Sequence, residues 1–259
     1  MTLHPKTYLE ELILTRPENR YKAGLCLCFL PLFSHYQDTV QYLHPQELDY
    51  YQSLKFERRI RSFLLGRYAA KKAAAALTKT ERLEEILVQP GVFTQPVITL
   101  HAHPNIQTTI THCEDLGGAI AFPEAHPLGI DIEKAGTNSV EALESQMTDA
   151  EKVLIRKYPE SYEFMLTLLW TAKEALSKVL KTGLMTSFKI LEIHKIELKD
   201  GYWLSFYKSF GQYKVISFKL GRYICSITFP LKTELTINLD LIQSNFEFLI
   251  HMEESKEIG

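Results

Sequence analysis

The sequence predicts an α+β fold in which two similar α/β subdomains pack as a pseudo-twofold dimer within one chain. Two Ala/Leu-rich helices that carry lysines are expected at 66–77 and 170–181, and strand-like segments follow each of them. Pro123 and Pro127 bracket a short polar connector between the two halves, which marks the domain boundary. We therefore expect an N-terminal subdomain of residues 1–125 and a C-terminal subdomain of residues 126–259.

The elements of the N-terminal half follow from local composition. The apolar run Ala23–Phe33 predicts a buried strand, and Pro45 with Glu47 in the first turn predicts a helix at 45–51. The Ala/Leu-rich stretch Ser62–Leu77 predicts a long helix. Shorter elements are expected after it: a helix or strand at 81–88, and strands at 110–111 and 118–122.

In the C-terminal half, a strand is expected at Leu128–Glu133, directly after the connector. Two helices are expected next, at 148–158 and 163–181. Four strand-like segments follow at 188–198, 202–207, 213–220 and 223–229. The order strand, helix, strands therefore occurs in both halves, although a residue-by-residue repeat is not visible.

Composition narrows the class of protein. The chain has 259 residues, of which 46% are hydrophobic, so it can bury a sizeable core. Its formal net charge of -2 provides no general attraction to nucleic acid or anionic membranes, and no apolar run is long enough to span a bilayer. Cys26 and Cys28 lie within an apolar run without a second Cys/His pair, which favours buried side chains over half of a zinc site. We expect a cytoplasmic monomer that binds no nucleic acid and no membrane.

The segment Gly129–Glu133 carries the first chemical signal. In a strand, Asp131 and Glu133 point to the same face, because side chains alternate. Two neighbouring carboxylates raise each other's pKa unless a cation lies between them, and oxygen ligands suit Mg²⁺. By itself the pattern is also typical of a plain polar strand face.

A second signal lies on the later helix. Glu174 and Lys178 are four residues apart and so share one helix face, where they could form an ordinary surface ion pair. Alternatively, Glu174 is a third metal ligand or a base, and Lys173, Lys178 and Lys181 offer positive charge to phosphates. The combination with Asp131 and Glu133 favours this second interpretation.

These two segments together resemble the signature of the 4'-phosphopantetheinyl transferases: Gly129-Ile-Asp-Ile-Glu133 and, some forty residues later, Trp170-x-x-Lys-Glu-Ala175. The chain length and two-part plan resemble the surfactin-synthetase type, a single-chain pseudo-dimer with the fold of that family. Upstream, Ile110–Cys113 resembles the family's I-S-H-S segment, and Arg61–Arg67 resembles the start of its basic helix. The four matches occur in the family's order.

The resemblance implies transfer of phosphopantetheine from coenzyme A to a serine of an apo acyl or peptidyl carrier protein, with release of 3',5'-ADP. It implies Mg²⁺, or Mn²⁺, held by Asp131, Glu133 and Glu174 together with the pyrophosphate of coenzyme A. Either Glu174 or Glu133 would be the general base, and Lys178 would assist the leaving phosphate. Lys173 would contact the phosphates.

Further coenzyme A contacts are implied in the N-terminal half. His112, with Thr111 beside it, would contact phosphates, and Arg61 would bind the 3'-phosphate, with Arg67 nearby. The adenine-contacting loop is placed at Gln95 and Pro96, where the usual Gly-Lys-Pro is replaced. All of these assignments are expectations carried over from the family.

Two other functions are compatible with parts of the pattern. Asp131-x-Glu133-Lys134 also resembles metal-dependent nucleases, but Lys134 would point away from the acids and the net charge does not favour DNA. A catalytically impaired protein of the same fold that only binds coenzyme A or a carrier is the non-enzymatic alternative. The presence of all three carboxylates and both helix lysines favours an active transferase over it.

Overall fold

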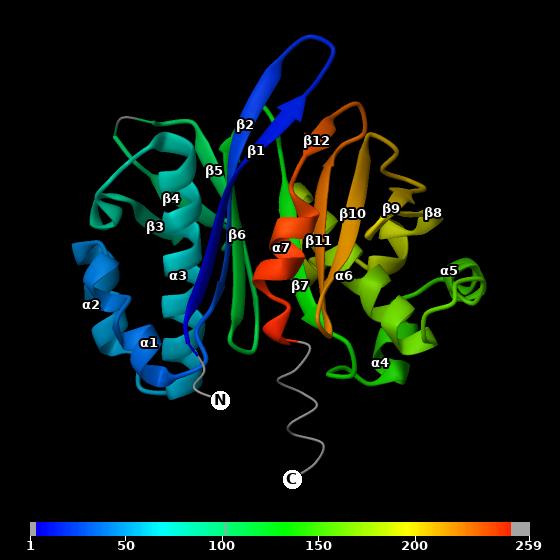
Figure 1. The fold of residues 1–259 in the computed structure, drawn as a ribbon, viewed down its shortest axis with the longest axis horizontal. Coiled ribbons are helices and arrows are strands. Elements are labelled where there is room, and N and C mark those ends of the chain that lie inside the picture. Colours follow the sequence, from blue (N-terminus) through cyan, green and yellow to red (C-terminus); the bar gives the residue numbers. More distant parts are fainter. Residues whose placement is uncertain (1–3, 102, 250–259) are drawn as a thin grey trace. The chain divides into compact units, whose positions relative to one another are not determined.

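The computed structural model describes residues 4–101 and 103–249, which form a mixed α/β protein with two antiparallel sheets (Figure 1). The chain divides into two compact units. Unit 1 comprises the described residues up to Leu128 together with Thr233–Ile237, and unit 2 comprises Gly129–Lys232 together with the described residues from Asn238 onward. The predicted α+β class is confirmed, and the division falls directly before the strand that carries the acidic pair.

Unit 1 contains a seven-stranded sheet in the order β12-β1-β2-β6-β5-β4-β3. Its strands are β1 (Lys6–Thr15), β2 (Arg20–Phe29), β3 (Leu87–Pro90), β4 (Pro96–Thr99), β5 (Ile106–Cys113), β6 (Leu116–Pro123) and β12 (Glu234–Thr236). Its helices are α1 (Phe33–Gln37), α2 (Pro45–Ser53) and α3 (Glu57–Thr78), with 3₁₀ turns η1 (Val40–Tyr42) and η2 (Leu83–Glu85). The alanine-rich face of α3 packs on β2, β5 and β6, where small side chains allow a close approach.

Unit 2 contains a five-stranded sheet in the order β7-β11-β10-β9-β8. Its strands are β7 (Gly129–Lys134), β8 (Ile193–Lys199), β9 (Tyr202–Tyr207), β10 (Tyr213–Leu220) and β11 (Tyr223–Pro230). Its helices are α4 (Val140–Ser145), α5 (Asp149–Ile155), α6 (Tyr162–Leu180) and α7 (Leu239–Asn245), with 3₁₀ turns η3 (Gly183–Met185) and η4 (Phe188–Leu191). The long helix α6 packs on β7 and β11.

The two units repeat one plan. The order β2-β6-β5-β4-β3 in unit 1 corresponds strand for strand to β7-β11-β10-β9-β8 in unit 2, and the long helix follows the first of these strands in each. A glycine lies where this strand meets the helix: a Cβ on Gly24 would lie 2.0 Å from the Ala73 carbonyl oxygen, and one on Gly129 would lie 2.0 Å from that of Ala175. Only glycine allows so close an approach, so these contacts fix which residues of the two units correspond.

Six of the described helices and strands were not expected from the sequence: β1, β4, β12, α1, α4 and α7. Strand β1 pairs with β2 along its whole length, and the three-residue strand β12 pairs with β1, so a segment near the C-terminus completes the sheet of unit 1. Helix α7 follows directly. The strand predicted at 188–198 begins only at Ile193, because η4 comes first. In the described part of the chain, no helix is long and apolar enough to cross a membrane.

A buried histidine binds the segment Thr233–Ile237 to the rest of unit 1. The Nε2 atom of His126 lies 2.8 Å from the Thr233 hydroxyl, both side chains are fully buried, and the Tyr21 ring lies against the imidazole. Burial lowers the pKa of His126 from 6.5 to about 4. The neutral imidazole is therefore the form that fits the folded state.

Because the pKa of buried His126 is lowered, we expect the folded state to lose stability in mild acid. Between the two pKa values the unfolded chain binds the proton more tightly, so the contribution is complete above pH 6.5 and falls as the pH drops toward 4. The free energy of unfolding should fall by about 2 kcal/mol from pH 7.5 to pH 5 through this residue alone. Urea unfolding of wild type and His126→Gln at both pH values measures it, and an equal pH dependence in the two proteins would refute the assignment.

Candidate metal and phosphate site

Strand β7 and helix α6 bring the predicted acidic residues together in unit 2. Gly129, Asp131 and Glu133 alternate along β7 and so share the face that Gly129 presents to α6. Glu174 precedes Ala175, the residue whose carbonyl group approaches Gly129. The close strand–helix contact therefore places Glu174 beside the two acids of the strand.

The three carboxylates influence one another's charge. Burial raises the pKa of Glu133 to about 7, and the charges of Asp131 and Glu174 add to the effect. Burial likewise raises the pKa of Glu174 to about 7, again with a contribution from Asp131. Such a cluster favours either protons or a cation, because three negative charges in a half-buried site repel.

Lys178 supplies the positive charge in this cluster. Its ammonium group donates to Asp131 Oδ1 at 2.7 Å and to the Ile130 carbonyl at 2.9 Å, and its side chain is 24% exposed. The surface pair Glu174–Lys178, which the spacing also allowed, is therefore not the main contact of this lysine. Asp131 is almost completely buried, so a cation beside it is needed to balance its charge.

Within the described ranges, no three His, Cys, Asp or Glu side chains are arranged as a ready metal cage. The donor set nevertheless suits Mg²⁺ chemically, since all three candidates are carboxylates that share one electrostatic environment. Mg²⁺ commonly binds through a few carboxylates and completes its shell with water and substrate phosphate.

Trp170 is a neighbour of the site whose role was not predicted, although it belongs to the signature segment. Its ring lies 4.7 Å from that of Phe188 in η4, and its side chain favours the charged form of Glu133, against the larger effect of burial on the pKa of that acid. Its place in the motif, one turn before Glu174, was the available signal. The indole therefore links the helix to the second acid of the strand.

Lys173 does not have the surface position that a phosphate contact requires. Its side chain is fully buried, and its ammonium lies 2.7 Å from Glu151 Oε2 and 3.2 Å from the Gln146 carbonyl oxygen. Burial lowers its pKa, whereas the charge of Glu151 raises it. The expectation that Lys173 binds phosphate thus conflicts with its burial, and the residue ties α6 to α5 instead.

Arg61 lies at the start of α3 in unit 1. Its guanidinium group contacts Glu57 at 2.7 Å and Asp115 at 3.3 Å, and it lies over the rings of Phe33 and Tyr36. The side chain is 29% exposed, so a fixed cationic group remains accessible to an anion.

His112 also lies near the start of α3, because its Nε2 atom is 2.7 Å from the Ser62 hydroxyl. His112 is exposed and Thr111 is buried, since neighbouring residues of β5 point to opposite faces of the sheet. The two side chains therefore do not share one phosphate-facing surface, in contrast to the expectation. His112 remains a candidate and Thr111 is a buried strand residue.

The other residues predicted to bind coenzyme A lie in different surroundings. Arg67 is mostly buried, lies over the Phe63 ring and pairs with Glu47 at 3.7 Å, and burial lowers its pKa. Gln95 accepts a hydrogen bond from the Phe93 amide within the turn before β4, which begins at Pro96. Gln95 and Pro96 therefore shape a turn, and Arg67 supports the fold of unit 1.

The repeated plan shows what unit 1 holds in place of the acids. Counting from the paired glycines, Asp131 and Glu133 correspond to Cys26 and Cys28, and Glu174 corresponds to Lys72. Cys26 and Cys28 are fully buried thiols, and burial raises the pKa of Cys26. Because neutral thiols and a lysine do not attract Mg²⁺, the positions of unit 1 that correspond to the three acids do not suit this ion.

Comparison with known families agrees with this location. Residues 127–228 match the model of the 4'-phosphopantetheinyl transferase superfamily. The matched segment contains Asp131, Glu133, Glu174 and Lys178. It supports a transferase that moves phosphopantetheine. No curated protein matches the chain.

Proposed function

We propose that the protein transfers 4'-phosphopantetheine from coenzyme A to a serine hydroxyl of an apo acyl or peptidyl carrier protein, as a holo-acyl-carrier-protein synthase of the surfactin-synthetase type. The reaction would release 3',5'-ADP. The observation that carries the proposal is the cluster of three interacting carboxylates and one lysine within the segment that matches the superfamily.

In this proposal Asp131, Glu133 and Glu174 hold Mg²⁺, or Mn²⁺, together with the pyrophosphate of coenzyme A. A bound divalent cation would offset negative charge on the phosphate that is attacked and on the one that leaves. The raised pKa values of Glu133 and Glu174 support this assignment, because a bound cation would favour the charged carboxylates that burial and mutual repulsion disfavour.

The remaining steps use side chains of this chain. Glu174, or alternatively Glu133, is the general base that would accept the proton of the incoming serine, because each is a carboxylate of the cluster. Lys178, with its partly exposed ammonium group, stabilises the leaving phosphate. The ammonium group of Lys178 can leave Asp131 and contact the phosphate only if another cation balances the buried charge of Asp131. A bound divalent metal ion would supply that charge.

Arg61 and His112 are proposed as phosphate contacts of coenzyme A, with Arg61 on the 3'-phosphate. Arg61→Gln should weaken coenzyme A binding about tenfold, which is about 1.4 kcal/mol, because a charge-assisted hydrogen bond is lost. Dephospho-coenzyme A lacks the 3'-phosphate, so its affinity should not change. Calorimetric titration with both ligands measures this, with exposed Arg59→Gln as the control. Equal weakening for both ligands would exclude the 3'-phosphate contact.

The activity is tested by mass spectrometry of apo carrier proteins incubated with the protein, coenzyme A and Mg²⁺. A carrier mass increased by one phosphopantetheine group, lost with chelator and restored by Mg²⁺ or Mn²⁺, is the expected result. No gain on any carrier of a fatty-acid, polyketide and peptide-synthesis panel would favour the impaired, binding-only protein. Plasmid nicking that requires Asp131 would favour a nuclease, although Lys134 lies over the Tyr223 ring, on the face of β7 opposite Asp131 and Glu133.

A further inference from the structure

One turn of α6, residues 172–175, is held by three different elements. The Tyr207 hydroxyl of β9 donates to the Ala172 carbonyl at 2.8 Å and lies 2.8 Å from the Thr228 hydroxyl. Ala175 is held by its close contact with Gly129 of β7. The third contact joins Lys173 to Glu151 of α5. Glu174 lies within this turn, so its place relative to the strand acids depends on these contacts.

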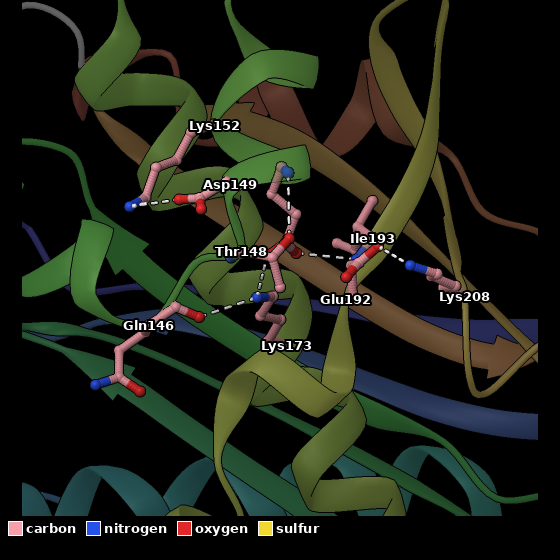
Figure 2. A network of polar contacts seen from close by, with 9 residues as sticks. Gln146, Thr148, Asp149, Lys152, Lys173, Glu192, Ile193 and Lys208 are labelled. Carbon is pink, nitrogen blue, oxygen red and sulfur yellow. Dashed lines mark hydrogen bonds and ion pairs between the residues drawn. The ribbon is translucent and has the colours of Figure 1, made fainter.

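Glu151 is the centre of the third contact. Its Oε2 atom pairs with Lys173 and accepts from the Thr148 amide at 2.8 Å, and its Oε1 atom accepts from the Ile193 amide at 2.9 Å. Figure 2 shows the ammonium group of Lys173 between Gln146, whose carbonyl oxygen it contacts, and Thr148. Glu151 is fully buried, so one carboxylate connects the start of α5, the start of β8 and the middle of α6.

Unit 1 contains the same arrangement, a buried glutamate that pairs with a lysine of the long helix and accepts a hydrogen bond from a strand amide. Glu47, near the start of α2, pairs with buried Lys71 of α3 at 2.7 Å and accepts from the Val88 amide at 2.9 Å. Lys71 and Lys173 each precede by two residues the alanine that meets the paired glycine. After Lys71 comes Lys72, however, whereas after Lys173 comes Glu174. The same ion pair therefore adjoins a candidate metal ligand in unit 2 only.

We propose that Glu151 and Tyr207 are positioning residues, which act through Lys173 and Ala172 to hold Glu174 in the geometry that binds the metal. This inference rests on the proposed function of the carboxylate cluster. An outer contact that fixes a ligand commonly changes metal affinity by about 10- to 100-fold. The corresponding ion pair of unit 1, Glu47–Lys71, contributes to stability and does not change the affinity for the metal.

The test compares two double variants that each remove one buried lysine–glutamate pair: Glu151→Gln with Lys173→Met, and Glu47→Gln with Lys71→Met. Both should lower the midpoint of thermal unfolding, and the unit 1 variant by at least as much, because it also removes the carboxylate that lies 3.7 Å from Arg67. Only the unit 2 variant should raise the Kd for Mn²⁺ by about tenfold or more and lower kcat. The Kd is measured by calorimetric titration of Mn²⁺ into the full-length chain.

Equal Mn²⁺ affinity in the two folded double variants would overturn the positioning role. If a double variant does not fold, Tyr207→Phe is used in its place, because this change removes only one hydroxyl group and keeps the packed ring. A several-fold weaker Mn²⁺ affinity of Tyr207→Phe supports the positioning role, and an unchanged affinity overturns it. A wild-type chain that binds Mn²⁺ but modifies no carrier would refute the proposed transfer and leave the positioning role intact. A wild-type chain that binds no Mn²⁺, either alone or in the presence of coenzyme A, would refute both.

Discussion

Replacing Asp131 by Ala, or Glu174 by Gln, should lower the rate of phosphopantetheine transfer at least about 1,000-fold, or about 4 kcal/mol of transition-state stabilisation. Each change removes a negative charge from the proposed metal site, and Glu174→Gln also removes the candidate base. Asp131→Ala additionally leaves Lys178 without its 2.7 Å partner. Transfer to an apo carrier is followed by mass spectrometry at saturating Mg²⁺.

The control for these variants is Asp149→Asn on α5, an acidic residue of the same unit whose side chain is fully exposed. Its transfer rate should equal that of wild type. Near-normal transfer by Glu174→Gln at saturating Mg²⁺ would remove Glu174 from both roles and leave Glu133 as the base. Near-normal transfer by Asp131→Ala would contradict the metal site itself.

Gly129→Ala should destabilise the protein by about 3 kcal/mol, because the new methyl group would lie 2.0 Å from a backbone oxygen of α6. The neighbour is helix backbone and not the end of a flexible side chain, so the strand and helix must move apart. Since Asp131 follows on the strand and Glu174 lies beside the contact, the affinity for Mn²⁺ should fall as well. Urea unfolding and Mn²⁺ titration measure the two effects.

Gly211→Ala is the matched control, because a Cβ at this position of unit 2 meets no atom within 4 Å. Its free energy of unfolding and its Mn²⁺ affinity should stay close to those of wild type. If Gly129→Ala were as stable as Gly211→Ala, the close strand–helix contact that places Glu174 beside Asp131 would be wrong.

Much of the acidic cluster could be predicted because it depends on local periodicity. Alternation along Gly129–Glu133 puts two acids on one face, and the Trp170–Ala175 motif lies on a helix that its composition already indicated. The α+β class followed from the same patterns. What those patterns could not supply was the pairing of residues far apart in the chain.

The exceptions show this limit. Lys173 has the charge of a phosphate contact, but its partner Glu151 is 22 residues away, so its burial was not visible in the sequence. Strand β12 consists of three residues that pair only with β1, which no local signal reveals. The internal repeat was hidden because its chemically important positions differ: acids at 131 and 133 correspond to Cys26 and Cys28.

The number of divalent cations bound per chain tests the metal assignment most directly. Titration of the full-length protein with Mn²⁺ should give one site, which is lost in Asp131→Ala and kept in Asp149→Asn, because only unit 2 has carboxylates at the paired positions. A chain that binds no Mn²⁺ at neutral pH in the presence of coenzyme A, or whose site survives Asp131→Ala, would contradict the account.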